Sequence, residues 1–277
     1  MNILVTNDDG IDSPGLWALA EAISRVGGTL IVAPDKQQSG VGTSVSLHSG
    51  MSVAEVSSPI EGVRAYAIGG TPSDCVIIGL RRLAQEHINL VVSGINLGPN
   101  VGNDIPYSGT VMATLQGYFR KIPSIAISLA TRERGEEPRF DVASKVAESL
   151  ALSMKNGKMP TDAILNINVP NIPLEQIKGI VTTRTASRGS GGLSTVQEGS
   201  GVRFSRSAEA PTSTDFPHQV AVDKAHELEE GTDFWAIHEG YISITPLRPN
   251  FTDHNLIPAL TEHIIALESD LLGNSTG

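Results

Sequence analysis

The sequence lacks most of the features that mark secreted and membrane proteins. Its 277 residues contain a single cysteine, Cys75, which excludes an intrachain disulfide and a zinc cluster made of cysteines. No segment approaches the ~20 consecutive apolar residues of a membrane-spanning helix. The chain also starts with an apolar, strand-like segment instead of a basic, leader-like one. We therefore expect a cytoplasmic protein in which Cys75 is a small buried residue on a helix.

The sequence also has few basic residues and lacks two common nucleotide-binding motifs. Lys and Arg number 20 against 30 Asp and Glu, and the net charge of −10 argues against binding of polymeric nucleic acid through its phosphates. A small phosphorylated substrate is compatible with this charge, because a bound cation supplies positive charge locally. No Gly-x-Gly-x-x-Gly follows the first predicted strand, which disfavours an NAD-linked oxidoreductase. No Gly-Lys-Ser/Thr follows Gly40 and Gly42, so that loop is not a P-loop.

Apolar runs of strand length alternate with helical segments in the first part of the chain. Strands are predicted at 3–6, 29–33, 53–56, 63–68, 90–93, 124–128 and 163–169, and helices at 14–26, 71–85, 108–119 and 140–154. This alternation predicts an α/β catalytic core over residues 1–175. Its sheet is expected to be doubly wound and mostly parallel, with helices on both faces.

The pattern changes in the C-terminal extension, residues 176–277. A stretch rich in Gly and Ser predicts a β-hairpin arm at about 184–207, although a disordered loop is the alternative. A strand is expected to return at 241–245 and a final helix at 257–267. Because the arm has few apolar residues to bury on its own chain, we expect the extension to contact a partner subunit.

Two neighbouring carboxylates, Asp8 and Asp9, follow the first predicted strand. Such a pair is costly without a counter-charge, and oxygen ligands favour Mg²⁺, Mn²⁺ or Ca²⁺. Ser39 follows the second strand and Asn96 follows the strand at 90–93. Because ligands bind at the carboxyl ends of the strands in a doubly wound sheet, these four oxygen donors predict one octahedral cation site. The alternative for each residue is an ordinary solvated turn.

A glycine-rich loop at 100–110 predicts a phosphate site beside this cation site. It leads into a helix at Ser108 or Gly109, and free N–H groups at a helix start attract anions. The hydroxyls of Ser108 and Thr110 are candidate donors, and Gly40 permits a close backbone approach. The alternative for Ser108 is an ordinary helix cap. Tyr107 is the nearest aromatic residue to this site.

Six segments together resemble the signature segments of the SurE (survival protein E) nucleotidases: 7–16, 33–40, 70–75, 93–96, 107–110 and 240–247. The resemblance implies a Rossmann-like core and a cytoplasmic phosphomonoesterase that uses one Mg²⁺ or Mn²⁺ per subunit. It also implies a homodimer or homotetramer built partly by exchanged C-terminal elements. The metal ligands of the family fall on Asp8, Asp9, Ser39 and Asn96, and its phosphate loop on Ser108, Gly109 and Thr110. Departures occur at Leu97, Pro99 and Asn103, and 184–232 matches no motif.

The expected reaction is hydrolysis of nucleoside 5′-monophosphates, and also of 3′-monophosphates, by a directly attacking water. Attack by Asp8 or Asp9 is the alternative, but aspartyl-phosphate enzymes space their two aspartates by one residue. Asp233 and His238 are a weaker candidate pair for protonating the leaving group, or else packing residues. With aromatics at 4% of the chain, we expect loose base preference. A non-catalytic nucleotide-binding module is the alternative function, although unneutralised aspartates would repel phosphate.

Overall fold

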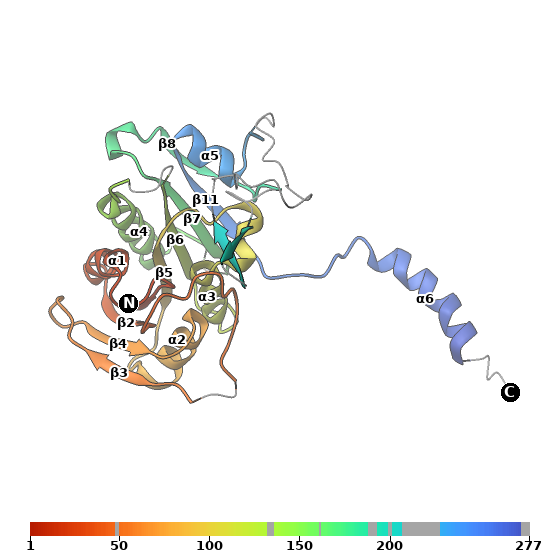
Figure 1. Ribbon diagram of the computed structural model, residues 1–277, viewed down its shortest axis with the longest axis horizontal. Coiled ribbons are helices and arrows are strands. Elements are labelled where there is room, and N and C mark those ends of the chain that lie inside the picture. Colours follow the sequence, from red (N-terminus) through yellow and green to blue (C-terminus); the bar gives the residue numbers. More distant parts are fainter. Residues whose placement is uncertain are drawn as a thin grey trace. The chain divides into compact units, whose positions relative to one another are not determined.

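The computed structural model describes residues 1–47, 50–131, 136–160, 162–187, 193–198, 201–206 and 228–272 (Figure 1). The chain divides into two compact units, Met1–Leu247 and Arg248–Gly277. The first unit contains a nine-stranded sheet, and the second contains the helix α6 (Ile257–Leu272). None of the described helices has the length and apolarity needed to cross a bilayer.

The strands of the large sheet, in chain order, are β1 (Asn2–Thr6), β2 (Gly28–Pro34), β3 (Val53–Val56), β4 (Arg64–Ile68), β5 (Leu90–Leu97), β6 (Ser124–Ala130), β7 (Ile164–Pro170), β8 (Gly179–Thr182) and β11 (Tyr241–Leu247). The helices of this unit are α1 (Pro14–Ser24), α2 (Pro72–Ile78), α3 (Gly109–Tyr118), α4 (Phe140–Lys155) and α5 (Asp233–Glu239). Short helical turns add η1 (Gly79–Leu83), η2 (Gly102–Tyr107) and η3 (Leu174–Gln176).

The strand order is β3-β4-β2-β1-β5-β6-β7-β11-β8. Strands β4, β2, β1, β5, β6 and β7 run parallel, whereas β3 pairs antiparallel with β4 and β11 antiparallel with β7. The chain winds from β1 in one direction through β2 and then returns to the other side of β1 through β5. This confirms the doubly wound, mostly parallel α/β fold and places its switch point between β1 and β5, where such sheets bind ligands.

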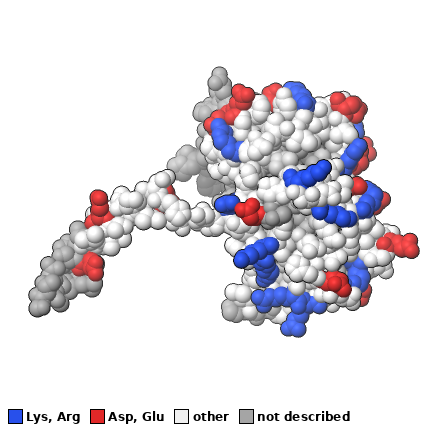
Figure 2. Space-filling model, turned by 180° about the vertical axis from the view of Figure 1, so that it is seen from behind, with Lys and Arg blue, Asp and Glu red and all other residues white. Residues whose placement is uncertain are grey.

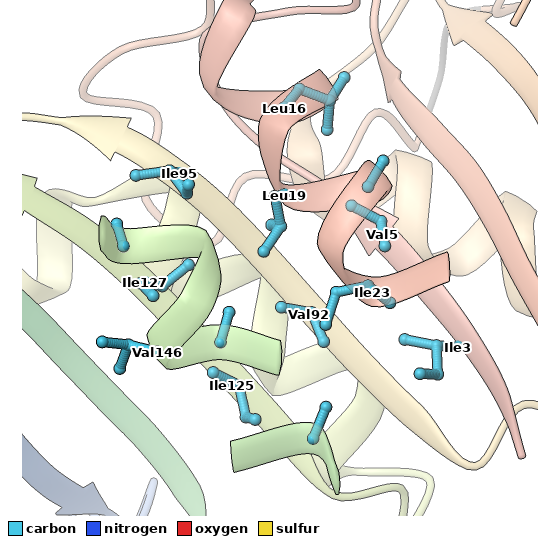
Figure 3. Packing of buried hydrophobic residues seen from close by; sticks show 14 of the residues in the cluster. Ile3, Val5, Leu16, Leu19, Ile23, Val92, Ile95, Ile125, Ile127 and Val146 are labelled. Carbon is cyan, nitrogen blue, oxygen red and sulfur yellow. The ribbon is translucent and has the colours of Figure 1, made fainter. Parts of the chain in front are cut away.

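Helices cover both faces of the sheet (Figure 1). Leu16, Leu19 and Ile23 of α1 pack with Ile3 and Val5 of β1 in a cluster that continues onto β5, β6 and α4 (Figure 3). On the opposite face, a second cluster joins alternate strand residues such as Leu4 with α2 and α3. Because successive strand residues point to opposite faces, apolar strands of this kind need a helical layer on each side.

Several predicted elements have different bounds in the structure. The helix expected to run from 71 to 85 is wrong beyond Ile78, because the α-helix gives way there to the π-helical turn η1, which ends at Leu83. The strand expected at 90–93 is too short, because β5 pairs with β6 again at Asn96 and Leu97 after a register shift. Asn96 therefore lies within the strand and not after it.

Other local predictions are confirmed. Cys75 is fully buried on α2, and Thr71 caps that helix in a reciprocal pair of hydrogen bonds with Asp74. The antiparallel strands β9 (Leu193–Glu198) and β10 (Gly201–Arg206) form a hairpin within the predicted arm. Residues 188–192, 199, 200 and 207 of that arm lie outside the described residues. The division into a core over 1–175 and an extension over 176–277 differs from the structure, because strands β8 and β11 join the sheet of the core and the first compact unit extends to Leu247.

Charged side chains of both signs share the face of the first unit that Figure 2 shows. Lys and Arg are scattered there among Asp and Glu. Ion pairs among the described residues of the first unit include Arg25 with Glu148 at 3.2 Å and Lys178 with Glu239 at 3.3 Å, all on exposed or half-exposed side chains. Exposed pairs of this kind contribute little to stability, about 0–1 kcal/mol. This face is therefore a mixed, solvated surface.

Candidate functional site

The loop after β1 carries Asp8 and Asp9 and is held by backbone contacts with the loop after β2. Asn7 closes it, because its Oδ1 accepts the Gly10 N–H at 3.2 Å and its Nδ2 donates to the Gly10 carbonyl at 2.9 Å. Gly10 has a φ of +97°, and a Cβ there would lie 3.1 Å from the carbonyl carbon of Lys36. Glycine therefore allows the two loops to pack closely, and the Gln38 N–H donates to the Asp8 carbonyl at 2.7 Å.

Hydrogen bonds connect Asp9 with the other two predicted ligand segments. Gln37 Nε2 lies 3.0 Å from Ser39 Oγ and 3.5 Å from Asp9 Oδ1, so one amide group contacts both residues. The Asp9 carboxylate also accepts the backbone N–H of Leu97, the neighbour of Asn96. The structure thus brings the carboxyl ends of β1 and β5 and the loop after β2 together at the switch point.

Asn96 is oriented by its own strand end. Its Nδ2 donates to the Gly98 carbonyl at 2.7 Å, and the side chain is buried. Because the amide nitrogen is engaged in this bond, the amide oxygen is the atom that Asn96 can offer to a cation. This geometry fits the predicted role of Asn96, although the residue lies inside β5.

The electrostatics of the carboxylate pair favour a positive partner. Burial and the neighbouring charge of Asp8 raise the pKa of Asp9 from 3.8 to about 6, against the hydrogen bonds from Leu97 and Gln37. Among the described residues, no three His, Cys, Asp or Glu side chains gather as metal ligands. A cation here would therefore draw its remaining ligands from a hydroxyl and an amide oxygen, which suits a hard ion such as Mg²⁺ or Mn²⁺. The donor set fits the predicted ion.

Helix α3 begins directly against the Asp8 side chain. A Cβ on Gly109 would lie 2.8 Å from the Asp8 Cβ and 3.0 Å from its Oδ2, so only glycine permits this approach. The Thr110 hydroxyl donates to Asp8 Oδ1, and both side chains are buried. Ser108 caps the helix, since its Oγ accepts the Val111 N–H at 3.1 Å. The hydroxyls predicted to contact phosphate thus have partners within the protein. Because Ser108 caps the Val111 N–H, the N–H groups of Gly109 and Thr110 are the ones that this helix start offers to an anion.

The remaining predicted residues lie on the loops around this centre. The Gly42 N–H donates to the Tyr107 carbonyl at 3.1 Å, which joins the loop after β2 to the turn before α3. Gly40 has a φ of +75°, and a Cβ there would meet nothing within 4 Å. The Tyr107 side chain is 54% exposed. Gly40 and Tyr107 are therefore both accessible, on two loops that this backbone hydrogen bond joins.

Residues 3–191 match the family model described as "Survival protein SurE". The chain belongs to the SurE family. It is 43% identical over 251 residues to a protein named 5′-nucleotidase SurE from Dehalococcoides mccartyi, which covers 89% of this chain and 88% of that relative. It is 40% identical over 256 residues to the 5′-nucleotidase SurE of Geobacter sulfurreducens, with coverage of 92% and 90%.

A solved SurE structure has the same fold. The crystal structure of the SurE protein from Aquifex aeolicus matches with a TM-score of 0.76 and 34% sequence identity, over 95% of this chain and 100% of that chain. The resemblance read from the six sequence segments is thereby confirmed, and so is the Rossmann-like core.

Sequence reasoning missed a buried polar network behind the site of this SurE chain. Asn100, in the loop after β5, donates its N–H to Asn168 Oδ1 and its Nδ2 to Ser128 Oγ, both at 2.8 Å. Its carbonyl accepts from Asn166 Nδ2 at 2.9 Å and Asn168 Nδ2 at 3.0 Å. Two asparagines spaced by one residue in an apolar strand were the available signal, because alternate residues share one face. This network fixes the start of the glycine-rich loop 100–110 that is predicted to bind phosphate.

The two weaker acid–base candidates occupy opposite ends of α5. Asp233 is its fully buried first residue, and its carboxylate accepts backbone N–H groups. His238 lies in the last turn with its side chain 60% exposed, and its Nδ1 is 3.6 Å from Glu239 Oε1. The two residues are five positions apart in the helix, which corresponds to roughly 7–8 Å along its axis.

Proposed function

We propose that this SurE chain is a 5′-nucleotidase that hydrolyses nucleoside monophosphates with one Mg²⁺ or Mn²⁺ bound by Asp8, Asp9, Ser39 and Asn96. The observation that carries the proposal is the contact between the start of α3 and Asp8, which puts anion-binding N–H groups beside a carboxylate pair. A carboxylate pair alone repels phosphate, and a helix start alone binds it. Together they would suit a phosphate that binds beside a cation held by these carboxylates. The relatives named 5′-nucleotidase SurE support the same activity.

The protein groups have separate tasks in this reaction. When bound, the cation supplies Lewis-acid polarisation of the phosphoryl group and lowers the pKa of a bound water. The N–H groups of Gly109 and Thr110 hold phosphoryl oxygens, and they are already oriented before reaction. Thr110 fixes the Asp8 carboxylate by donating to Oδ1. Because Asp8 and Asp9 are adjacent and lack the one-residue spacing of aspartyl-phosphate enzymes, water is the nucleophile in this scheme.

We propose in addition that the nucleoside is held loosely. Tyr107 is exposed, and aromatic side chains make up 4% of the chain, so few rings are available to stack on a base. Specificity then rests on the phosphate, and we expect 3′-monophosphates to be hydrolysed as well as 5′-monophosphates. The predicted cytoplasmic location is part of this proposal, since nucleoside monophosphates are intracellular metabolites.

We further propose a homodimer or homotetramer. Helix α6 exposes several large apolar side chains: Ile257, Leu260, Ile264, Ile265 and Leu267. A monomeric soluble protein rarely leaves such a set exposed on one element, so a second subunit is the expected cover. Analytical ultracentrifugation tests this assignment, and a monomer at micromolar concentration contradicts it.

The activity is tested by phosphate release from AMP, GMP, CMP and UMP and from 3′-AMP. The purified chain is first treated with a chelator and then supplied with Mg²⁺ or Mn²⁺. We expect release only with the added ion, and less than a tenfold spread in kcat/KM across the bases. The matched control is Asp12→Asn, which alters an exposed carboxyl group in the same loop as Asp9. Nucleotide binding without phosphate release would overturn the proposal in favour of a non-catalytic binding module.

A further inference from the structure

The 3-10 helix η2 connects a buried anchoring point to the phosphate-side start of α3. It comprises six residues, from Gly102 to Tyr107, and Ser108 follows as the N-cap of α3. The Ser108 N–H donates to the Ile105 carbonyl at 3.2 Å, so the turn continues into the cap. Because this short turn has little internal freedom, a displacement of Gly102 moves the first turn of α3 and its N–H groups.

Asp233 provides the anchoring point at Gly102. Its Oδ2 accepts the Gly102 N–H at 2.9 Å, while its Oδ1 accepts the N–H groups of Ala186 and Phe234, each at 2.8 Å. Asp233 is fully buried, and burial raises its pKa while these N–H donors act in the opposite direction. Hydrogen bonds from N–H groups to a carboxylate are among the stronger ones in proteins. One side chain thus joins η2, the segment at Ala186 and the start of α5.

Backbone hydrogen bonds hold the segment next to Ala186 against the start of α5. The Asp233 N–H donates to the Arg184 carbonyl at 2.9 Å, and the Arg184 N–H donates to the Gly231 carbonyl at 3.0 Å. Asn103 of η2 makes a second hydrogen bond to this segment, because its Nδ2 donates to the Ser187 carbonyl at 2.6 Å. Asn103 is one of the positions that depart from the SurE pattern, where aspartate is expected, and an ionised aspartate cannot donate this bond.

We propose that Asp233 and Asn103 are positioning residues for the phosphate site. They hold the first residues of η2 against the segment 184–187 and thereby fix the N–H groups of Gly109 and Thr110 relative to Asp8. Neither side chain needs to touch the substrate. The inference rests on the proposed function, because it assumes that the start of α3 binds phosphate. It gives the buried Asp233 a role other than acid–base catalysis.

The test measures inorganic phosphate binding, which does not require turnover. Asp233→Asn, Asn103→Ala and the control Asp141→Asn, an exposed carboxyl on α4, are compared with wild type by isothermal titration calorimetry with Mg²⁺ present. We expect the phosphate Kd of Asp233→Asn to rise about tenfold, which corresponds to ~1.4 kcal/mol, close to the lower end of the range for a hydrogen bond to a charged group. Asn103→Ala should raise it about threefold, in keeping with a neutral hydrogen bond, and Asp141→Asn should not change it. The KM for AMP should rise in parallel, at a temperature where all variants are folded by circular dichroism.

A folded Asp233→Asn variant with unchanged phosphate Kd overturns the proposal, even if its Tm is lower. If that variant does not fold, Asn103→Ala decides, and an unchanged Kd there overturns it equally. A wild type that binds phosphate but releases none from nucleotides contradicts the proposed enzyme and leaves the comparison of Kd values valid. A wild type that binds no phosphate overturns the positioning role, because there is then no site to position.

Discussion

Replacing Asp9 by Asn should stabilise the cation-free protein at neutral pH while removing its activity. Burial and the charge of Asp8 raise the pKa of Asp9 from 3.8 to about 6. Because one pKa unit corresponds to ~1.4 kcal/mol, the ionised side chain costs the fold up to about 3 kcal/mol above pH 6. Asparagine keeps one acceptor for Gln37 and Leu97 but carries no charge. We expect it to recover about half of this cost, a rise in Tm of roughly 4 °C for a unit of this size.

The direction of this pKa shift determines how the free energy of unfolding of the cation-free protein changes with pH. Since the folded-state pKa lies above the ordinary value, the native protein binds this proton more tightly than the unfolded chain between pH 3.8 and about 6. Asp9 therefore lowers the free energy of unfolding as the pH rises through that window, and the penalty is complete above it. The gain from Asp9→Asn should be present at pH 8 and largely absent at pH 4. Urea unfolding of both proteins with excess chelator at the two pH values measures this difference.

Added Mn²⁺ provides an independent check on the same side chain. A ligand that binds only the native state raises the Tm, so the ion should stabilise wild type and have little effect on Asp9→Asn. Asp12→Asn, in the same loop, should behave like wild type in both experiments. A variant that is no more stable than wild type at pH 8, or equally stabilised at pH 4 and pH 8, would refute the electrostatic reasoning about Asp9.

Three further predictions concern the contacts around Asp8 and the network behind it. Gly109→Ala places a Cβ 2.8 Å from the Asp8 Cβ and should lower kcat/KM for AMP by about 10², the cost of a misplaced catalytic contact; near-normal kinetics would contradict the close packing. Thr110→Val removes the hydroxyl that donates to Asp8 and should lower kcat/KM about tenfold, and an unchanged value would show that this bond has no part in the reaction. Asn168→Ala removes both of its bonds to Asn100 and should reduce the free energy of unfolding by ~2–3 kcal/mol in urea titrations; a smaller loss than 1 kcal/mol would mean that water replaces the side chain.

The layered fold was predictable from local patterns, because strand and helix periodicities are properties of neighbouring residues. The π-helical end of α2 and the extension of β5 to Leu97 were not predictable in this way. The second pairing of β5 with β6 follows a register shift at Ser93, and that shift depends on the partner strand. Gly94, at a φ of +139°, is packed so that a Cβ would lie 2.3 Å from the Ile127 carbonyl oxygen. Such a contact between separate strands has no local signal.

The sequence by itself determined which oxygen donors are available, namely Asp8, Asp9, Ser39 and Asn96, and that they come from three segments near strand ends of an α/β sheet. It did not determine that Asn96 lies within β5 instead of after it. Only the tertiary structure decided how these residues are held. Gln37 contacting both Ser39 and Asp9, Gly109 packed on Asp8 and Asp233 anchoring Gly102 join residues that are distant in the chain. The physical reason is that periodicity reports which face of an element is buried, whereas contacts between loops depend on strand order and register, which arise only when the whole sheet is assembled.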